Sequence, residues 1–284
     1  MSSNPKYSSH ASAMRLPLLV SLLTAMTVLS GTSAAAAGTG VPRVVVNILV
    51  DQLRTDYLNA FMPLYGQEGF VRLLNEGRVY AQAEYPHYRP DRASAAATLA
   101  TGTTPYNHGI VALKWLDRET LRPVFCVNDK NYAGLQTTDA SSPTFLGVST
   151  VGDELKVATE GKALVYAIAP FRDAAILSAG HAADAAVWID DRTGQWCSTS
   201  YYGKALPSWT TVLNSNRLDD RLKTLTWKPS SDLVGNFSYF LSGGMKKPFN
   251  HKFTGAGRFA SYKTSGLINE EVVRAATQCI NGTM

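Results

Sequence analysis

The segment VVVNILVD, residues 44–51, is a mostly β-branched apolar run that ends in a carboxylate. A run of this kind is typical of a parallel strand that is covered on both faces. Asp51 then lies at the carboxyl end of the strand, where open α/β sheets place their ligand sites. A rigid carboxylate there can bind Zn²⁺ or Mg²⁺. It can equally cap a helix or pair with Arg54, and these alternatives stay open.

The residues that follow alternate between helical and strand patterns. Residues 69–74 have helical spacing with Gly77 as a stop, residues 78–84 are an expected strand, and an alanine-rich helix follows over 91–102. Residues 162–169, KALVYAIA, are a second buried strand of parallel type. Such alternation implies right-handed crossovers. The sequence therefore predicts an α/β fold with a doubly wound, mostly parallel sheet and helices on both faces.

Local signals place the later elements. Gly194 lies in the turn of an expected β-hairpin, and the stretch at about 185–260 reads as a hairpin followed by a cap-like excursion rich in Gly, Pro, Lys and Phe. Expected helices cover residues 150–158, 174–180, 207–216 with Ser208 as N-cap, and 269–280 with Asn269 as N-cap.

The first 37 residues have the pattern of a secretory signal. Lys6 and Arg15 precede an apolar run at 16–29, and small residues at 31–37 offer a cleavage site. The run is shorter than the roughly 20 residues that a bilayer span needs, and no later segment is long and apolar enough for one. We therefore expect residues 38–284 to form a periplasmic or secreted domain without a membrane span.

The charge and the cysteines exclude some classes of partner and site. The chain carries a net charge of +5, and about +3 once Lys6 and Arg15 leave with the signal, too little to indicate a nucleic-acid partner. Cys126, Cys197 and Cys279 lack metal-type spacing. One pair could form a disulfide in an exported protein, or all three could be buried free thiols.

The segment RPDRASAAATLATGTTPYNHGI, residues 89–110, is the candidate active site. A hydroxyl at a helix N-terminus is favoured as a nucleophile, because free N–H groups and the helix dipole stabilise an alkoxide and an incoming phosphate. Ser94 and Thr98 are the available hydroxyls, and Ser94 is nearer the helix start. Arg92 could hold phosphate oxygens with its forked guanidinium. The alternative is a small-residue helix chosen for tight packing, with Asp91 as its cap.

Five segments in order give the chain a family resemblance: ILVDQLRTDYL, EGFVRLLNEGRVY, PDRASAAATLATGTTPYNHGIV, WLDR and SAGHAADAAVWID. Together they resemble the alkaline phosphatase superfamily, in its branch of bacterial exported phosphatases and nucleotide pyrophosphatase/phosphodiesterases, over about residues 42–205. The resemblance implies an alkaline-phosphatase-like fold and a hydrolase with two zinc ions.

Carried over by position, the resemblance makes Asp51 a metal ligand. The nucleophile position falls on Arg92 by an ungapped count, or on Ser94 if the loop is shifted. Arginine cannot attack phosphorus, so activity requires Ser94. Leu113 stands at the position of a phosphate-binding asparagine, and Lys114 could substitute for it.

A Lys-x-Arg pair of the family is matched here by Phe171 and Asp173. Arg172, between them, could replace the lost charge, whereas Asp173 would repel phosphate. The family's later metal-ligand motifs, Asp-x-x-x-His and Asp-His, do not occur in this sequence. We do not expect His108 or His181 to bind metal, and we expect the chain to be the amino-terminal portion of a longer protein.

Two functions follow from these residues. The first is an exported, zinc-dependent hydrolase of small phosphate esters, a phosphomonoesterase or phosphodiesterase, which forms a phospho-enzyme on Ser94. The alternative is a catalytically silent, alkaline-phosphatase-like binding protein that has lost the nucleophile and the phosphate clamp. The related phosphate mutases are disfavoured because they are cytosolic. The oligomeric state is open.

Overall fold

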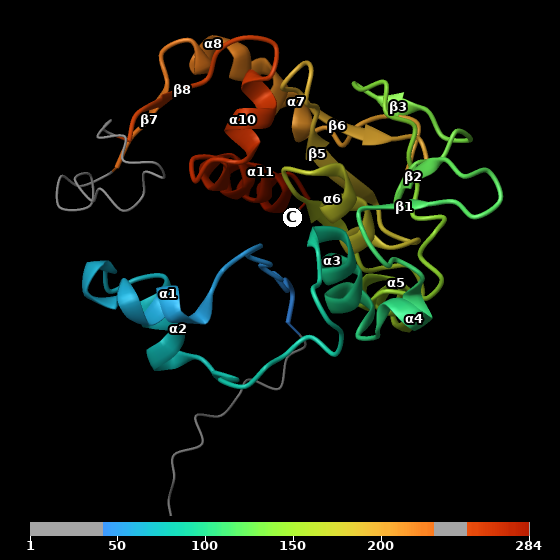
Figure 1. Cartoon of the computed structure of the whole chain (residues 1–284), viewed down its shortest axis with the longest axis horizontal. Helices are drawn as coiled ribbons and strands as arrows, with labels where there is room; N and C mark the ends of the chain where they lie inside the picture. The colour runs from blue at the N-terminus through green and yellow to red at the C-terminus, as the bar shows by residue number, and fades with distance from the viewer. Residues whose placement is uncertain (1–41, 230–248, 284) are drawn as a thin grey trace, which may run out of the picture. The chain divides into compact units, whose positions relative to one another are not determined.

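The computed structural model describes residues 42–229 and 249–283 of the chain (Figure 1). The predicted signal, residues 1–37, lies outside the described residues, as does the 230–248 part of the expected excursion. The chain divides into two compact units, Met1–Ile48 and Leu49–Met284. None of the described helices combines the length and the apolar character needed to cross a lipid bilayer.

Short helices and strands alternate along the second unit (Figure 1). The helices are α1 (Thr55–Ala60), the 3₁₀ helix η1 (Met62–Leu64), α2 (Phe70–Glu76), α3 (Arg92–Thr101), α4 (Pro105–His108), α5 (Val151–Ala158), α6 (Arg172–Ala179), α7 (Thr210–Ser215), α8 (Leu218–Leu222), α10 (Arg258–Lys263) and α11 (Ile268–Thr283). The strands are β1 (Lys114–Leu116), β2 (Pro123–Phe125), β3 (Gly134–Leu135), β4 (Tyr166–Ile168), β5 (Ala185–Ile189), β6 (Trp196–Thr199), β7 (Thr226–Trp227) and β8 (His251–Lys252).

The main sheet has four strands in the order β3-β6-β5-β4. β4 and β5 are parallel, with Ala167 opposite Ala186, and α6 connects them. β5 and β6 form the predicted hairpin, and Gly194 in its turn has a φ of +69°. The α/β class is confirmed. The sheet is mixed within the described residues, because β6 pairs antiparallel with both of its neighbours.

β5 lies at the centre of two hydrophobic clusters. Its residues are all buried and alternate between the clusters: Ala186 and Trp188 belong to the first, and Val187 and Ile189 to the second. The first cluster contains side chains of α3 and α6, and the second contains side chains of α7, α8, α10 and α11. Helices therefore cover both faces of the sheet, as predicted.

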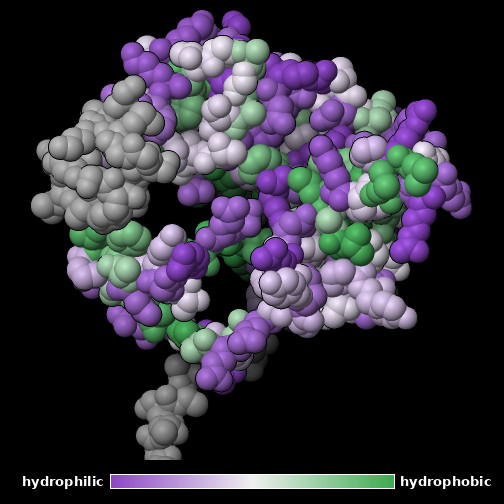
Figure 2. Space-filling model, viewed as in Figure 1, coloured by the Kyte–Doolittle hydropathy of each residue, from purple (hydrophilic) through white to green (hydrophobic). Residues whose placement is uncertain are grey.

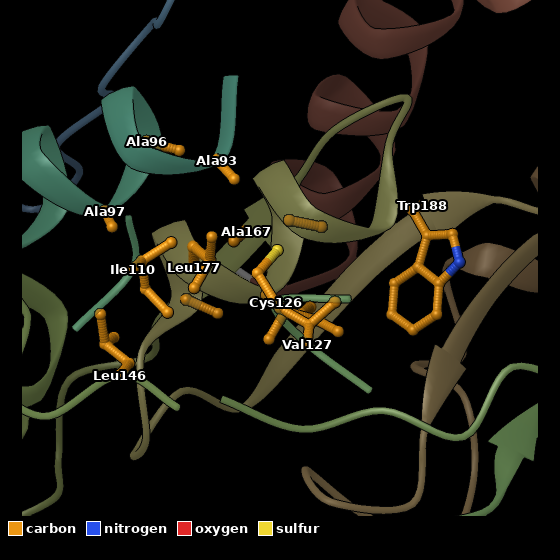
Figure 3. Close-up of a cluster of buried hydrophobic side chains, with 14 of the residues drawn as sticks. Ala93, Ala96, Ala97, Ile110, Cys126, Val127, Leu146, Ala167, Leu177 and Trp188 are labelled. Carbon is orange, nitrogen blue, oxygen red and sulfur yellow. The ribbon is translucent and has the colours of Figure 1, made fainter. Parts of the chain in front are cut away.

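The alanines of α3 form one buried face. Ala93, Ala96 and Ala97 have the i, i+3, i+4 spacing of a helix face and are at most 1% exposed. Figure 3 shows them with Leu177 of α6 in the cluster that contains Cys126. Small side chains let α3 and α6 approach closely. The interpretation of residues 91–102 as a small-residue helix that packs tightly is thus confirmed.

Two predicted strands are absent. Residues 44–50 and 78–84 have no strand structure, and Val45 is 80% exposed. A β-branched run forms a strand only when a neighbour satisfies its backbone hydrogen bonds, and no such neighbour is found within residues 42–229 and 249–283. Leu116 and Leu121 are also exposed, and green patches mark apolar residues on the face shown in Figure 2.

The remaining helices match their predictions with small shifts. α2 ends at Glu76 with Gly77 as its C-cap, and α5 and α6 cover the expected segments. α7 begins at Thr210 with Trp209 as its N-cap, so Ser208 is not the cap. α11 begins at Ile268, which places Asn269 inside its first turn. β5 and β6, the start of the expected excursion, belong to the main sheet.

All three cysteines are free and buried. Burial raises the pKa of the Cys126 thiol to about 12 and that of Cys279 to about 11, and it also raises the pKa of Cys197. Because the thiolate is the reactive form, we expect iodoacetamide at pH 8 to modify none of them in the native protein. All three should react in denaturant without reductant, as counted by mass spectrometry. A single adduct under those conditions would reveal a disulfide.

Candidate functional site

The site is built around the N-terminus of α3. Asp91 is the N-cap, and its Oδ1 accepts a hydrogen bond of 2.9 Å from the backbone N–H of Ser94. The Ser94 hydroxyl in turn accepts the backbone N–H of Asp91 at 3.0 Å. This reciprocal capping box satisfies two backbone donors at the helix start. Asp91 Oδ2 also accepts the backbone N–H of Leu113, which anchors the following loop to the cap.

The Ser94 hydroxyl is therefore occupied by the cap. Its hydroxyl group donates to Asp91, at 3.0 Å from Oδ1, and the residue is 1% exposed. A nucleophile must reach its substrate, and this hydroxyl faces the helix cap and the core. The position of Ser94 gives it a capping role, and its part as the attacking group stays a prediction.

Arg92, at the first position of α3, is held by an ion pair. Its Nε and Nη2 donate to the two carboxylate oxygens of Asp173 at 2.7 and 3.0 Å. Its guanidinium also stacks on the Phe171 ring, 3.9 Å from the ring centre. The Asp173 side chain is 2% exposed, against 25% for that of Arg92. The predicted phosphate clamp is thus already engaged in a two-point pair with a buried carboxylate.

The charges around this pair stabilise the charged form of the Arg92 guanidinium. Burial alone would lower the pKa of Arg92, but the hydrogen bonds and charge of Asp173 outweigh that effect, and the pKa is raised. The charges of Asp51 and Asp91 act in the same direction. Three carboxylates therefore lie close enough to the helix start to influence Arg92, a surrounding that opposes a phosphate anion.

Asp173 and Lys263 are the residues whose part in the site was not foreseen. Asp173 was expected to repel phosphate, and it instead neutralises Arg92. The Lys263 ammonium lies 4.8 Å from the Phe171 ring centre, on a side chain that is 3% exposed. It donates to the Ile189 carbonyl at 2.7 Å and to Asp191 at 2.6 Å. No sequence motif marks either partner.

The other two predicted phosphate-binding side chains lie around a different ring. Arg172 lies 4.5 Å and Lys114 5.9 Å from the centre of the Phe125 ring. Arg172 also donates to Ser141 Oγ at 2.9 Å. Lys114 and Arg172 therefore share the Phe125 ring as a neighbour, while Arg92 is held separately by Phe171 and Asp173. Their binding of substrate remains a prediction.

Asp51 lies in a turn after the apolar run, exposed to solvent. Within the described residues, no group of three or more histidine, cysteine, aspartate or glutamate side chains could hold a metal ion. Two zinc ions need a larger set of deprotonated donors. Asp51 fits as one ligand, but residues 42–229 and 249–283 do not supply a full set.

His108 and His181 have structural partners. His108 is fully buried, lies 3.0 Å from Thr98 Oγ1 through Nε2, and accepts the Ile110 N–H at Nδ1. Burial, and secondarily the charge of His87, lowers its pKa. His181 lies 3.2 Å from Asp153. The contact of His108 also engages the Thr98 hydroxyl. That neither histidine binds metal stays a prediction.

Comparison with known proteins shows which family the chain belongs to. The family model for type I phosphodiesterase / nucleotide pyrophosphatase matches residues 45–274. The chain belongs to this family. PhoV of Synechococcus elongatus and PafA of Elizabethkingia meningoseptica, both named alkaline phosphatases, are each 34% identical, over 218 and 206 residues. These alignments cover 76% and 70% of the chain but 39% and 38% of the relatives, so the chain spans about two fifths of their length.

Solved structures confirm the fold of this family member. The crystal structure of wild-type PafA matches with a TM-score of 0.69 at 29% identity, covering 82% of the chain and 48% of PafA. A structure of a PafA variant with four substitutions matches with a TM-score of 0.67. The resemblance to the alkaline phosphatase superfamily and its α/β fold are thus confirmed.

The capping role of Ser94 gives a direct prediction. Ser94→Ala should lower the free energy of unfolding by about 1 kcal/mol, because the partly buried Asp91 N–H loses its acceptor. Thermal unfolding measures this. Ser215→Ala, an exposed serine that bonds its own helix, is the matched control and should change stability by less than about 0.5 kcal/mol. Equal effects of the two substitutions would contradict the cap.

Proposed function

We propose that this chain is part of an alkaline-phosphatase-like protein that does not transfer phosphoryl groups to α3 and acts as a binding protein. The observation that carries the proposal is the ion pair of Arg92 with buried Asp173, stacked on Phe171, at the start of this helix. Membership of the family gives the chain a phosphoesterase fold. The residues that depart from the family pattern are the ones expected to carry the chemistry.

The spacing of the altered positions agrees in part with that of the positions substituted in a PafA variant. The four-fold PafA variant carries changes at a threonine, at an asparagine 21 residues later, and at a lysine and an arginine two residues apart. In this chain Leu113 lies 21 residues after Arg92, and Asp173 lies two residues after Phe171. The first interval is equal in the two chains, whereas the interval from the second to the third position is 62 residues in PafA and 58 here. The equal interval supports the interpretation that Arg92 and Leu113 stand at two of the substituted positions.

The changes also compensate one another physically. By the ungapped count Arg92 stands at the nucleophile position, and a half-buried cation there needs a partner. Asp173 supplies it from the position that the resemblance assigns to a phosphate-binding arginine. Phe171, at the position assigned to the lysine, gives Arg92 a ring to stack on. The hydroxyls nearest the helix start, those of Ser94 and Thr98, are both engaged. The helix start therefore lacks an available phosphoryl acceptor.

A second candidate is an active, zinc-dependent hydrolase of small phosphate esters. The 34% identity to two alkaline phosphatases favours it. Asp51 would then be one metal ligand, with the others on residues beyond those described. Two bound zinc ions would supply Lewis-acid stabilisation of the displaced phosphate. Its location in the periplasm or outside the cell remains a prediction from residues 1–37.

Turnover of the full-length protein separates the candidates. Purified protein with zinc is incubated with p-nitrophenyl phosphate and with bis-p-nitrophenyl phosphate, beside its Arg92→Ala and Asp51→Ala variants. The binding-protein proposal predicts the same background release of nitrophenol from all three. Release by the parent that Asp51→Ala abolishes would establish the hydrolase and overturn the proposal.

A further inference from the structure

His108 is a fully buried histidine at the end of α4, and its ring joins two segments of the chain. Its Nε2 lies 3.0 Å from the hydroxyl oxygen of Thr98 on α3, and its Nδ1 accepts the backbone N–H of Ile110 at 3.1 Å. Nδ1 can accept that hydrogen bond only when it carries no proton, so the proton of the neutral ring is on Nε2. The Nε2–H group therefore donates to Thr98.

The surroundings of His108 are unsuited to a second proton on its ring. A proton on Nδ1 would face the N–H of Ile110, and the hydrogen bond between the two groups would be lost. The charge would also lie beside the hydrophobic cluster that contains Ile110 and Leu146 (Figure 3). A buried imidazolium without a carboxylate partner is costly, so the folded structure favours the neutral ring.

The titratable groups around His108 add to this cost. The charge of His87, in the loop before α3, acts against a charge on His108. Both ring nitrogens of His87 are buried, and within the described residues they have no hydrogen-bond partner. Residues 146–147 contact His108 through its backbone carbonyl and His181 through Nε2. Asp153 pairs with His181, and among residues 42–229 and 249–283 no carboxylate forms an ion pair with His108.

His108 lies at the start of a segment that leads to the cap of α3. Residues 108–113 end at Leu113, whose backbone N–H donates to Asp91, the N-cap of the helix. His108 holds the start of this segment to α3 through Thr98, and Asp91 holds its end. Loss of the His108 contacts would therefore loosen the segment that contacts the start of α3.

We propose that His108 is an acid-sensitive latch: a proton bound at Nδ1 breaks the hydrogen bond to Ile110 and releases residues 108–113 from α3. The latch is closed when the ring is neutral and opens when the ring is charged. Histidine is the side chain whose charge changes most readily between pH 5 and 8, which suits it to this role. The latch acts whether or not α3 accepts a phosphoryl group.

The direction of the pH effect follows from the two states of the latch. In the closed state burial, and secondarily the charge of His87, lowers the pKa of His108. In the open state the ring is in water and binds its proton with an ordinary pKa of about 6.5. Opening is therefore favoured as the pH falls below about 6.5, and the effect stops growing once the pH is below the lowered pKa of the closed state.

Hydrogen exchange of the full-length protein tests the latch. Exchange is followed by mass spectrometry at pH 7.5 and pH 5.0, and corrected for the intrinsic rate at each pH, in a peptide that spans residues 108–113 and in one from α11. The opening constant of residues 108–113 should be at least about fivefold larger at pH 5.0, since a proton bound by one state alone changes the constant by up to about tenfold per pH unit. An equal rise in α11 would show general loosening by acid and would overturn the proposal.

Two variants make this result specific to one ring. His108→Gln retains a donor for Thr98 but cannot gain a proton, so its opening constant should be equal at the two pH values, whatever its size. The matched control is His251→Gln, an exposed histidine on β8, which should keep the pH dependence of the parent. A parent whose residues 108–113 open no more at pH 5.0, or a rise that persists in His108→Gln, would overturn the latch.

A second measurement needs no substitution. In full-length protein labelled with ¹⁵N at histidine, NMR reports which ring nitrogens carry a proton. His108 should have a bare Nδ1 and a protonated Nε2 at pH 7.5, and Nδ1 should gain its proton over the pH range in which residues 108–113 lose protection. A proton on Nδ1 at pH 7.5, with residues 108–113 still protected from exchange, would contradict the proposal.

Discussion

Asp173→Ala is expected to lower the free energy of unfolding by about 3 kcal/mol. The substitution removes both hydrogen bonds from Arg92 and leaves its half-buried guanidinium without a counter-charge. Breaking a buried ion pair by removing one partner costs about 3–5 kcal/mol, and the 25% exposure of the Arg92 side chain favours the lower end of that range. Chemical unfolding followed by circular dichroism measures the change.

A matched control and a rescue make this result specific. Asp139→Ala removes a carboxylate that is 45% exposed and 3.8 Å from Arg172, and it should cost less than about 1 kcal/mol. Arg92→Met combined with Asp173→Leu replaces the pair by apolar groups and should recover most of the lost stability. An Asp173→Ala protein as stable as the control would show that the ion pair does not hold α3 to α6.

The second large effect is expected from reversing the changed positions. Arg92→Thr, Phe171→Lys and Asp173→Arg together raise the net charge by two and remove the carboxylate that faces the helix start. Inorganic phosphate should then bind at least about tenfold more tightly than to the parent, since nearby opposite charges favour the anion. Isothermal titration at low ionic strength measures the affinity.

A charge control accompanies that variant. Glu160→Lys also raises the net charge by two, on a side chain that is 82% exposed. It should change phosphate affinity far less than the triple variant does, because solvent and salt screen the charge of an exposed side chain. If the triple variant unfolds at the parent's temperature and binds phosphate no more tightly than Glu160→Lys does, these positions do not form a phosphate site.

Local rules predicted the parts of the structure that depend on nearby residues. The cap at Asp91, the alanine face of α3 and the turn at Gly194 each follow from a few adjacent positions and the geometry of one element. β4 was predictable because its partner β5 is also within the described chain. The run at residues 44–50 is also mostly apolar but has no partner within the described residues, and it is not a strand.

The site itself could be predicted only in its components. Arg92 and Asp173 were both noticed as departures from the family, but they are 81 residues apart, and their pairing depends on how α3 packs against α6. The sequence could not show that one unfavourable charge neutralises the other. It also could not show that a capping box occupies the Ser94 hydroxyl, since the same serine in an open loop would be free to react.

The central claim is that the start of α3 no longer accepts a phosphoryl group, and trapping tests it most directly. Full-length protein is incubated with zinc and p-nitrophenyl phosphate, quenched in acid, digested, and the peptide that carries Arg92–Thr101 is examined by mass spectrometry. We predict that this peptide is unmodified at every time point. Phosphate found on Ser94 or Thr98 would contradict the account.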